Sequence, residues 1–175
     1  MNPKILRITE TAALTALLAA LQAATRPAGQ LVTGSCVNAV LALAVLLAGL
    51  WSGAAVALIS PFLAFLLGIG PQVPPIVPAI AAGNLVYITL LWALCQRRKG
   101  APPLRQVPAW LIAALGKFAA LYLIVVQILC RVLPLKQPQI DTFSAMFSWP
   151  QLVTALTGGA IALLLAPVLR RALRR

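Results

Sequence analysis

The chain has 175 residues, of which 62% are hydrophobic and 9% are charged, and its formal net charge is +12. Soluble globular domains are about 45–50% apolar and carry far more charge on their surfaces. This composition therefore excludes a soluble enzyme, a disordered tail and a disulfide-stapled secreted domain. With a mean hydropathy of +0.98, the chain is expected to be an integral membrane protein. Its basic residues lie at the ends of apolar segments and form no stripe, which argues against a nucleic-acid binder.

Six apolar segments follow one another along the chain. A transmembrane helix needs about 20 mainly apolar residues, and stretches rich in Gly, Pro or charge separate such segments. Pro61 predicts a kink in the third segment, and residues 68–75 are too rich in Gly and Pro for regular helix. The sequence predicts an all-α bundle of six transmembrane helices in a single membrane domain over residues 1–175. The expected spans are residues 10–25, 35–50, 54–67, 77–95, 108–133 and 150–169, of which the second and third can also be drawn as one buried hairpin.

The distribution of Lys and Arg predicts the orientation. With the N-terminus inside, ten basic residues fall on the cytoplasmic side, three fall outside and Lys117 lies within a span. Cytoplasmic loops carry the excess of Lys and Arg, so both termini are expected in the cytoplasm of a multi-pass plasma-membrane protein. The start of the chain also resembles a cleavable signal peptide, with Lys4 and Arg7 before an apolar run that ends in Ala23-Ala24-Thr25. Cleavage would leave five spans and an outward N-terminus, whereas the charge distribution favours six.

Lys117 is the most costly residue to place in a membrane. It lies nine residues into the fifth span, at a depth of roughly 13 Å. A charge at that depth costs about 3 kcal/mol even on permissive scales, and it usually faces the protein interior. The alternative is a lysine whose stem packs on lipid while its amine reaches the headgroups. Glu10 and Asp141, the only acids, do not match its depth, so a ligand or backbone carbonyls are candidate partners.

Other polar residues gather in the last three spans and share helix faces there. Asn84 and Tyr87 are three residues apart in the fourth span, and Gln151, Thr154 and Gly158 follow one face of the sixth. Each alone is more often a helix–helix hydrogen bond than a ligand contact, and Asn38 in the second span has a similar inward role or holds the first outer loop. Together they predict a substrate site that opens toward the outer side. Its expected residues are Asn84, Tyr87, Lys117, Gln127, Gln151 and Thr154.

The chain has no constellation typical of an enzyme. It has no His, no pair of acids, no GxSxG or HExxH motif and no P-loop. Cys36, Cys95 and Cys130 lie one per apolar segment without CxxC spacing, which is more typical of packing than of a metal site. We therefore expect no cofactor, no metal and no catalytic residue. A transporter built from this chain would need energy from a partner, or it would move its solute only down a concentration gradient.

Alanines follow one face of the first span. Ala12, Ala16 and Ala20 are four residues apart, and such spacing lets another helix backbone approach closely. The spacing alone leaves two alternatives equally open, which are packing within this chain and contact with a partner subunit.

Several segments together resemble a known family. The TAALTALLAAL run from Thr11, the Gly34-Ser35-Cys36-Val37-Asn38 segment, Ser60-Pro61 and Gly68-Ile69-Gly70-Pro71 are similar to the substrate-binding S components of energy-coupling factor (ECF) vitamin transporters. The resemblance extends over essentially the whole chain, including its length, six spans and alanine-rich first helix.

The resemblance implies a prokaryotic subunit that captures a vitamin or related nutrient at the outer face. Such a subunit would topple in the membrane and deliver its ligand with a membrane-embedded coupling subunit and two cytoplasmic ATPases. The family's AxxxA contact would fall on Ala12 and Ala16, or on Ala16 and Ala20. The ligand pocket would use the last three spans, with residues 26–35 and 68–78 as lids. The alternatives are a stand-alone permease or channel and a non-transport membrane enzyme or scaffold.

The charge balance around the expected pocket favours some ligands over others. Lys117, Arg131, Lys136 and Arg26 face only Asp141. A cation such as thiamine would meet no anionic partner inside the membrane, which is costly. An anionic or neutral ligand with hydrogen-bonding groups is therefore expected.

Overall fold

The computed structural model describes residues 3–96 and 106–173, and in these residues the chain is helical with no strand. The all-α prediction is confirmed for this part of the chain. Of the basic residues assigned to the cytoplasmic side, Arg97, Arg98, Lys99, Arg105, Arg174 and Arg175 lie outside the described residues. The elements are α1 (Pro3–Thr25), η1 (Arg26–Ala28), α2 (Gln30–Ala48), α3 (Leu50–Leu66), α4 (Ile76–Gln96), α5 (Val107–Leu121), η3 (Tyr122–Leu129), α6 (Cys130–Val132), α7 (Gln137–Met146) and α8 (Trp149–Leu173).

Helices overlap each of the six predicted spans, although α1 begins at Pro3 and α2 at Gln30, earlier than predicted. The described residues hold five stretches of helix that are long and apolar enough to cross a membrane. The exception is α3, an apolar helix of 17 residues. The predicted loop over residues 26–35 is wrong, because a 3-10 turn and the first turn of α2 occupy it. Gly29, at φ 84°, separates the two and allows α2 to begin at Gln30. A further helix, α7, forms in the segment expected to be an outer loop.

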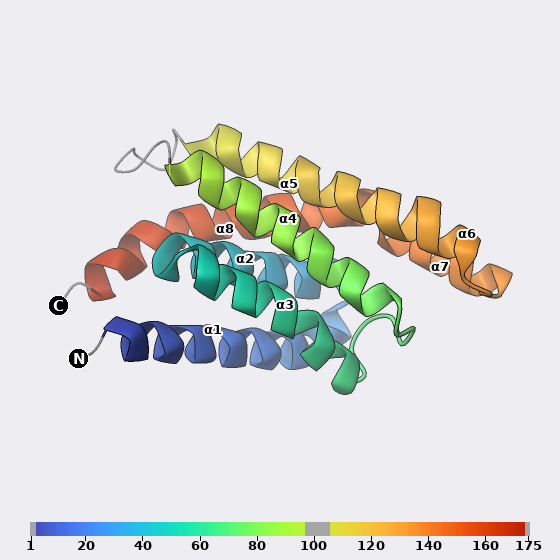
Figure 1. Ribbon diagram of the computed structural model, residues 1–175, viewed down its shortest axis with the longest axis horizontal. Helices are drawn as coiled ribbons and strands as arrows, with labels where there is room; N and C mark the ends of the chain where they lie inside the picture. Colours follow the sequence, from blue (N-terminus) through green and yellow to red (C-terminus); the bar gives the residue numbers. More distant parts are fainter. Residues whose placement is uncertain (1–2, 97–105, 174–175) are drawn as a thin grey trace.

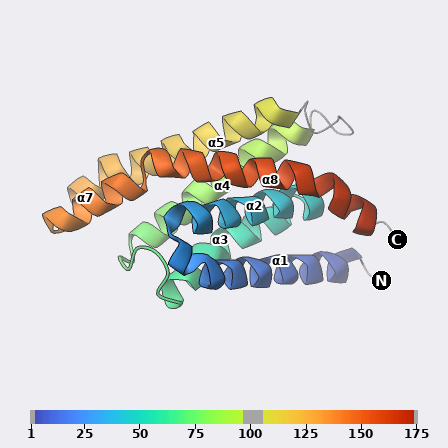
Figure 2. The same ribbon diagram turned by 180° about the vertical axis from the view of Figure 1, so that it is seen from behind.

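The helix α2 forms the centre of the bundle and lies between α1 and α8 (Figure 2). Its residues 38–45 are all buried, which suits a helix that is apolar on every side. At Gly158 of α8, an added Cβ would lie 2.5 Å from the carbonyl oxygen of Ser35 and 2.6 Å from the backbone nitrogen of Ala39. The backbones of α2 and α8 therefore approach closely at this glycine, which brings their polar side chains together.

The fifth span is one continuous helix with a change of winding. α5 passes into the π-helix η3 and then into α6, so helix runs without a break from Val107 to Val132. It ends at Leu133, which is extended at φ −78° and ψ 143°. Leu133 precedes Pro134, and a residue before proline is disfavoured in helical conformation.

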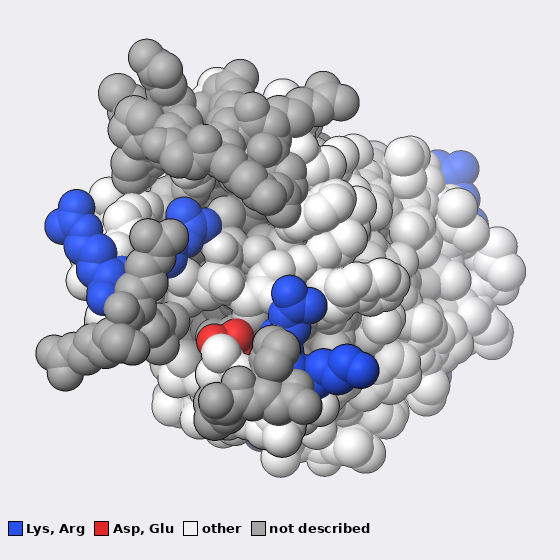
Figure 3. Space-filling view, turned by 60° about the vertical axis from the view of Figure 1, so that its left-hand side comes forward, with Lys and Arg blue, Asp and Glu red and all other residues white. Residues whose placement is uncertain are grey.

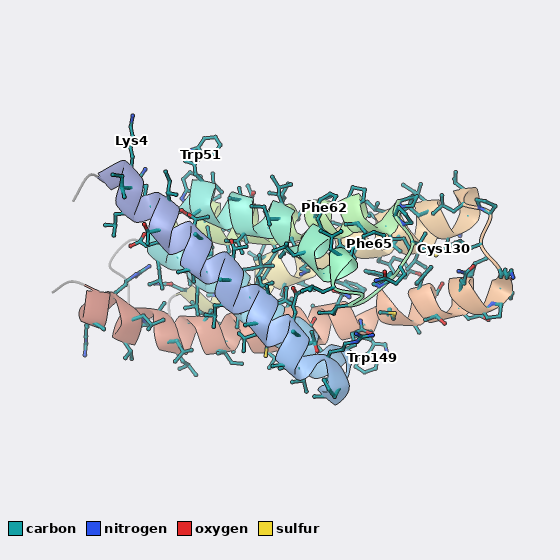
Figure 4. The ribbon with its side chains drawn as sticks, turned by 90° about the horizontal axis from the view of Figure 1, so that it is seen from below. Lys4, Trp51, Phe62, Phe65, Cys130 and Trp149 are labelled. Carbon is teal, nitrogen blue, oxygen red and sulfur yellow. The ribbon has the colours of Figure 1, made fainter. Side chains whose placement is uncertain are left out.

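Both described ends of the chain lie at the same end of the bundle, whereas α6 and α7 extend beyond α1 at the other end (Figure 1). Lys and Arg gather on the face at the termini (Figure 3). Trp51 is 83% exposed and lies toward the end that carries Lys4 (Figure 4). Trp149 is 61% exposed and lies in the opposite half of the molecule (Figure 4). Exposed tryptophans in both halves of the molecule are compatible with a protein that crosses two membrane interfaces.

Candidate functional site

A cavity of about 290 Å³ lies within the bundle. The loop after α3, which contributes to its lining, lies away from both termini (Figure 1). Exposed Arg26 and Gly70 lie at the margin of the cavity, and buried Lys117 lies inside it. Ligand pockets usually measure about 300–1,000 Å³, so this one suits a small molecule. Its polar lining residues come from α1, η1, α2, α3, α4, α5 and α8, and they are Gln22, Arg26, Gln30, Thr33, Asn38, Ser60, Asn84, Lys117 and Gln151.

Two asparagines hold the Lys117 ammonium inside the cavity. Lys117 is 3% exposed, and its Nζ donates to Asn38 Oδ1 at 2.6 Å and to Asn84 Oδ1 at 2.7 Å. The Nζ also lies 5.7 Å from the centroid of the Tyr87 ring, within the range of a cation–π contact. Lys117 therefore does not snorkel to the membrane surface, and neutral oxygens and an aromatic face stabilise its ammonium.

The amide of Asn38 is oriented by α8. Its Nδ2 donates to Thr154 Oγ1 at 3.2 Å, and the Thr154 hydroxyl in turn donates to the Gln151 carbonyl at 3.2 Å. Both Asn38 and Thr154 are 1% exposed. With its nitrogen held by Thr154, the amide of Asn38 turns its oxygen toward Lys117.

The amide of Asn84 is oriented by a break in the hydrogen bonding of α3. Pro61 has no backbone N–H, so it leaves the carbonyl of Ala57, four residues earlier, without its intrahelical donor. Asn84 Nδ2 donates to that carbonyl in a long hydrogen bond of 3.5 Å, and its oxygen faces Lys117. The proline predicted as a kink thus contributes an acceptor to the site.

The predicted site residues divide into three groups. Lys117, Asn84 and Gln151 line the cavity. Thr154 and Tyr87 lie behind its wall, where Tyr87 donates from its hydroxyl to the Ala155 carbonyl at 3.3 Å. Gln127 does not line the cavity; its Oε1 instead accepts a hydrogen bond from Arg131 Nη2, four residues later, at 2.6 Å.

The sequence prediction missed Gln22 and Ser60, and both line the cavity. Gln22 is 6% exposed and Ser60 is 1% exposed, and neither Gln22 Oε1 nor Ser60 Oγ has a hydrogen-bond partner among the described residues. A glutamine late in an alanine- and leucine-rich span was the available signal for the first. Ser60 was noted only as part of the Ser60-Pro61 segment that carries the family resemblance, and Pro61 was assigned to a kink.

The margin of the cavity is built from the loop after α3, the end of α7 and the starts of α2 and α8. Ile69, Gly70 and Pro71 follow α3, where positive φ angles at Gly68 and Gly70 turn the chain. The Met146 carbonyl at the end of α7 accepts from Gln30 Nε2 at 2.7 Å and from Gln151 Nε2 at 3.1 Å. The starts of α2 and α8 are therefore tied together beside the opening.

The alanine face of α1, defined as Ala12, Ala16 and Ala20, is exposed along its length. The opposite face of α1 packs inward, where Leu18 is 1% exposed. The close helix contact that the alanine spacing predicts is therefore not made within the described chain.

Comparisons with known proteins agree with this architecture. A family model described as "ECF transporter, substrate-specific component" matches residues 7–170. Searches of the curated proteins and of the solved structures found no match. Because the family model covers nearly the whole chain, including every helix that lines the cavity, the chain belongs to the family of substrate-specific components of ECF transporters.

Proposed function

We propose that this chain binds a vitamin or related small nutrient in the Lys117 cavity at the outer face of the plasma membrane and delivers it inward with an ECF coupling module. The observation that carries the proposal is a cavity with buried polar side chains, formed by the helices that the family model matches. Its buried polar network positions a cation, and its volume suits a small ligand. Substrate-specific components are transport subunits, so the cavity is interpreted as a binding site and not as an active site.

The proposed orientation places the termini in the cytoplasm and the cavity on the outer side. The described basic residues at the terminal end are Lys4, Arg7, Arg170 and Arg171. The other end holds Arg26, Arg131 and Lys136. This difference, together with the basic residues of the sequence outside the described part, favours cytoplasmic termini by the positive-inside rule.

The proposed partners are a membrane-embedded coupling subunit and two cytoplasmic ATPases, because the chain has no P-loop of its own. The alanine face is the proposed docking surface. Its side chains are small and exposed, so a partner helix could approach the backbone of α1 closely.

The proposal is tested by linking binding to uptake. The purified chain is equilibrated with yeast extract, a mixture of water-soluble nutrients, and the retained compound is identified by mass spectrometry. Cells that express the chain with an intact coupling module should accumulate this compound. Cells with the chain alone, or with a module whose ATPases are inactivated, should not. Equal accumulation in all three would contradict the proposal and favour a stand-alone permease.

A further inference from the structure

The ammonium group of Lys117 in the cavity has a hydrogen-bond donor that its two asparagine partners do not use. A lysine ammonium carries three donors, and Lys117 uses two of them on Asn38 and Asn84. No third acceptor contacts Nζ among the described residues. Because Lys117 is buried and lines the cavity, its remaining N–H is available to a ligand inside it.

No anionic side chain lines the cavity. The chain has only two acids, and neither Glu10 nor Asp141 is among the lining residues. Arg26 at the margin adds a second positive charge. An anionic ligand would therefore be attracted at the opening and would form a charge-assisted hydrogen bond inside. A cationic ligand would be repelled at both places.

The cavity also contains two buried polar atoms without a hydrogen-bond partner among the described residues, an amide oxygen and a hydroxyl, and both can accept a hydrogen bond. Gln22 Oε1 and Ser60 Oγ lie on α1 and α3 and have no partner among the described residues. Both residues are more than nine-tenths buried. An unsatisfied buried polar group is costly, so a ligand that supplies an N–H or O–H group to either atom would remove that penalty.

The rest of the lining limits the size and the charge of the ligand. Apolar side chains such as Val37, Phe65, Ile80 and Phe147 cover much of the wall, so the body of the ligand is expected to be apolar or aromatic. One available lysine donor suits a carboxylate, whereas a phosphate dianion would need several donors to replace its hydration.

We infer that the cavity selects a small carboxylate-bearing nutrient with an apolar body and at least one hydrogen-bond donor. Its carboxylate binds Lys117, and its donor binds Gln22 or Ser60. This inference rests on the proposed function, and it adds the chemical class of the substrate and two subsites that the sequence did not indicate.

The first test uses yeast extract as the probe and compares wild type with Lys117→Met and Lys117→Arg. Lys117→Met keeps the length and apolar stem of the side chain, and Lys117→Arg keeps the charge. The compound retained by wild type should carry a carboxylate and should be retained at least tenfold less by Lys117→Met. Lys117→Arg should recover part of the retention. A retained compound that is neutral or cationic at neutral pH, or one that Lys117→Met retains equally, would overturn the inference, and so would the absence of any retained compound.

The second test compares the retained acid with its primary amide and with a derivative whose N–H or O–H donors are methylated. Wild type should bind the acid at least tenfold more tightly than the amide, and Lys117→Met should lose this preference. Methylation should weaken binding to wild type, but not to the Gln22→Met/Ser60→Ala double variant, since the partner atoms are then already absent. If methylation weakens binding to both proteins equally, the donor of the ligand does not bind Gln22 or Ser60, and this part of the inference is wrong.

The inference and the proposed function fail in different ways. Module-dependent uptake of a neutral compound would overturn the inference about the ligand and leave the proposed function standing. Retention of a carboxylate without module-dependent uptake would support the inference about the ligand and contradict the proposed transport function.

Discussion

At the residue scale, the central feature is a buried cation held by neutral oxygens. A buried charge is tolerated when hydrogen bonds satisfy it, and Asn38 and Asn84 supply acceptors to Lys117 at 2.6 and 2.7 Å. Neutral acceptors stabilise the ammonium without cancelling its charge. The same group therefore remains able to attract an anion, which a carboxylate partner in the protein would prevent.

This distinction gives a prediction for Asn84. Asn84→Asp would place an anion beside Lys117 and form an internal ion pair, so the protein should keep its melting temperature while its affinity for the retained acid falls at least tenfold. The loss corresponds to one charge-assisted hydrogen bond, about 1.5–3 kcal/mol. Asn84→Leu serves as the matched control, because it removes the acceptor and should lower both stability and affinity. Melting in detergent and isothermal titration measure the two quantities, and undiminished affinity in Asn84→Asp would contradict the role given to the Lys117 charge.

At the scale of elements, a proline in one helix prepares a side chain of another. Pro61 releases the Ala57 carbonyl of α3, and Asn84 of α4 donates to it. Close backbone packing at Gly158 has a similar effect between α2 and α8, since it brings Thr154 within reach of Asn38. The orientation of both asparagines therefore depends on where helix backbones are irregular or closely packed.

Replacing this proline should separate stability from binding. In Pro61→Ala, the backbone N–H is restored and the Ala57 carbonyl turns back toward it, so α3 should become more regular and the melting temperature should not fall. Weaker support of Asn84 should lower the affinity for the retained acid by roughly two- to tenfold, the value of one ordinary hydrogen bond. Pro167→Ala in α8 is the control, because Pro167 also lies inside a helix but does not line the cavity. Similar affinities in the two variants would refute the proposed role of Pro61.

The alanine face of α1 gives a prediction about docking. Ala16→Leu and Ala20→Leu add bulk to an exposed face, so uptake should be lost while the purified subunit still binds the retained acid. Ala119→Leu tests whether added bulk alone is harmful, since Ala119 is exposed on α5. Uptake assays with the coupling module and binding assays without it measure the two effects. Normal uptake in both α1 variants would show that this face contacts only lipid.

At the scale of the whole molecule, the cavity and the termini lie at opposite ends, which predicts the accessibility of the loop after α3. Ile69 lines the cavity, whereas Gln72 is exposed and does not line it.

This difference can be tested by cysteine labelling in a variant whose three native cysteines are first replaced by Ala. In cells, an impermeant thiol reagent should then label both Ile69→Cys and Gln72→Cys from outside. Saturating retained acid should protect Ile69→Cys at least severalfold and leave Gln72→Cys unchanged. Labelling of both only after the membrane is opened would reverse the proposed orientation, and no protection of Ile69→Cys would remove the loop from the site.

The sequence by itself determined the class of the protein, because the transfer of apolar side chains from water is an additive, local quantity. The apolar share and the spacing of Gly, Pro and charge predicted six helices, and the all-helical structure agrees. Lys117 stood out for the same reason, since the cost of a charge inside a membrane does not depend on knowing its neighbours. Of the six residues predicted to form the site, Asn84, Lys117 and Gln151 line the cavity, and each is a polar residue that stands out within an apolar span.

Only the tertiary structure decided which partners these residues have. Nothing in the local sequence places Asn38 against Lys117, 79 positions away, or directs the Ala57 carbonyl toward Asn84. The sequence could not decide the role of Gln22 and Ser60 either, because a lone polar residue in an apolar helix is compatible both with a contact to a neighbouring helix and with a cavity. Conversely, Gln127 was predicted as a site residue, whereas in the structure it lies outside the cavity and accepts a hydrogen bond from Arg131. Hydrogen bonds between helices depend on rotation and separation of the helix axes, and the packing of the whole chain sets both.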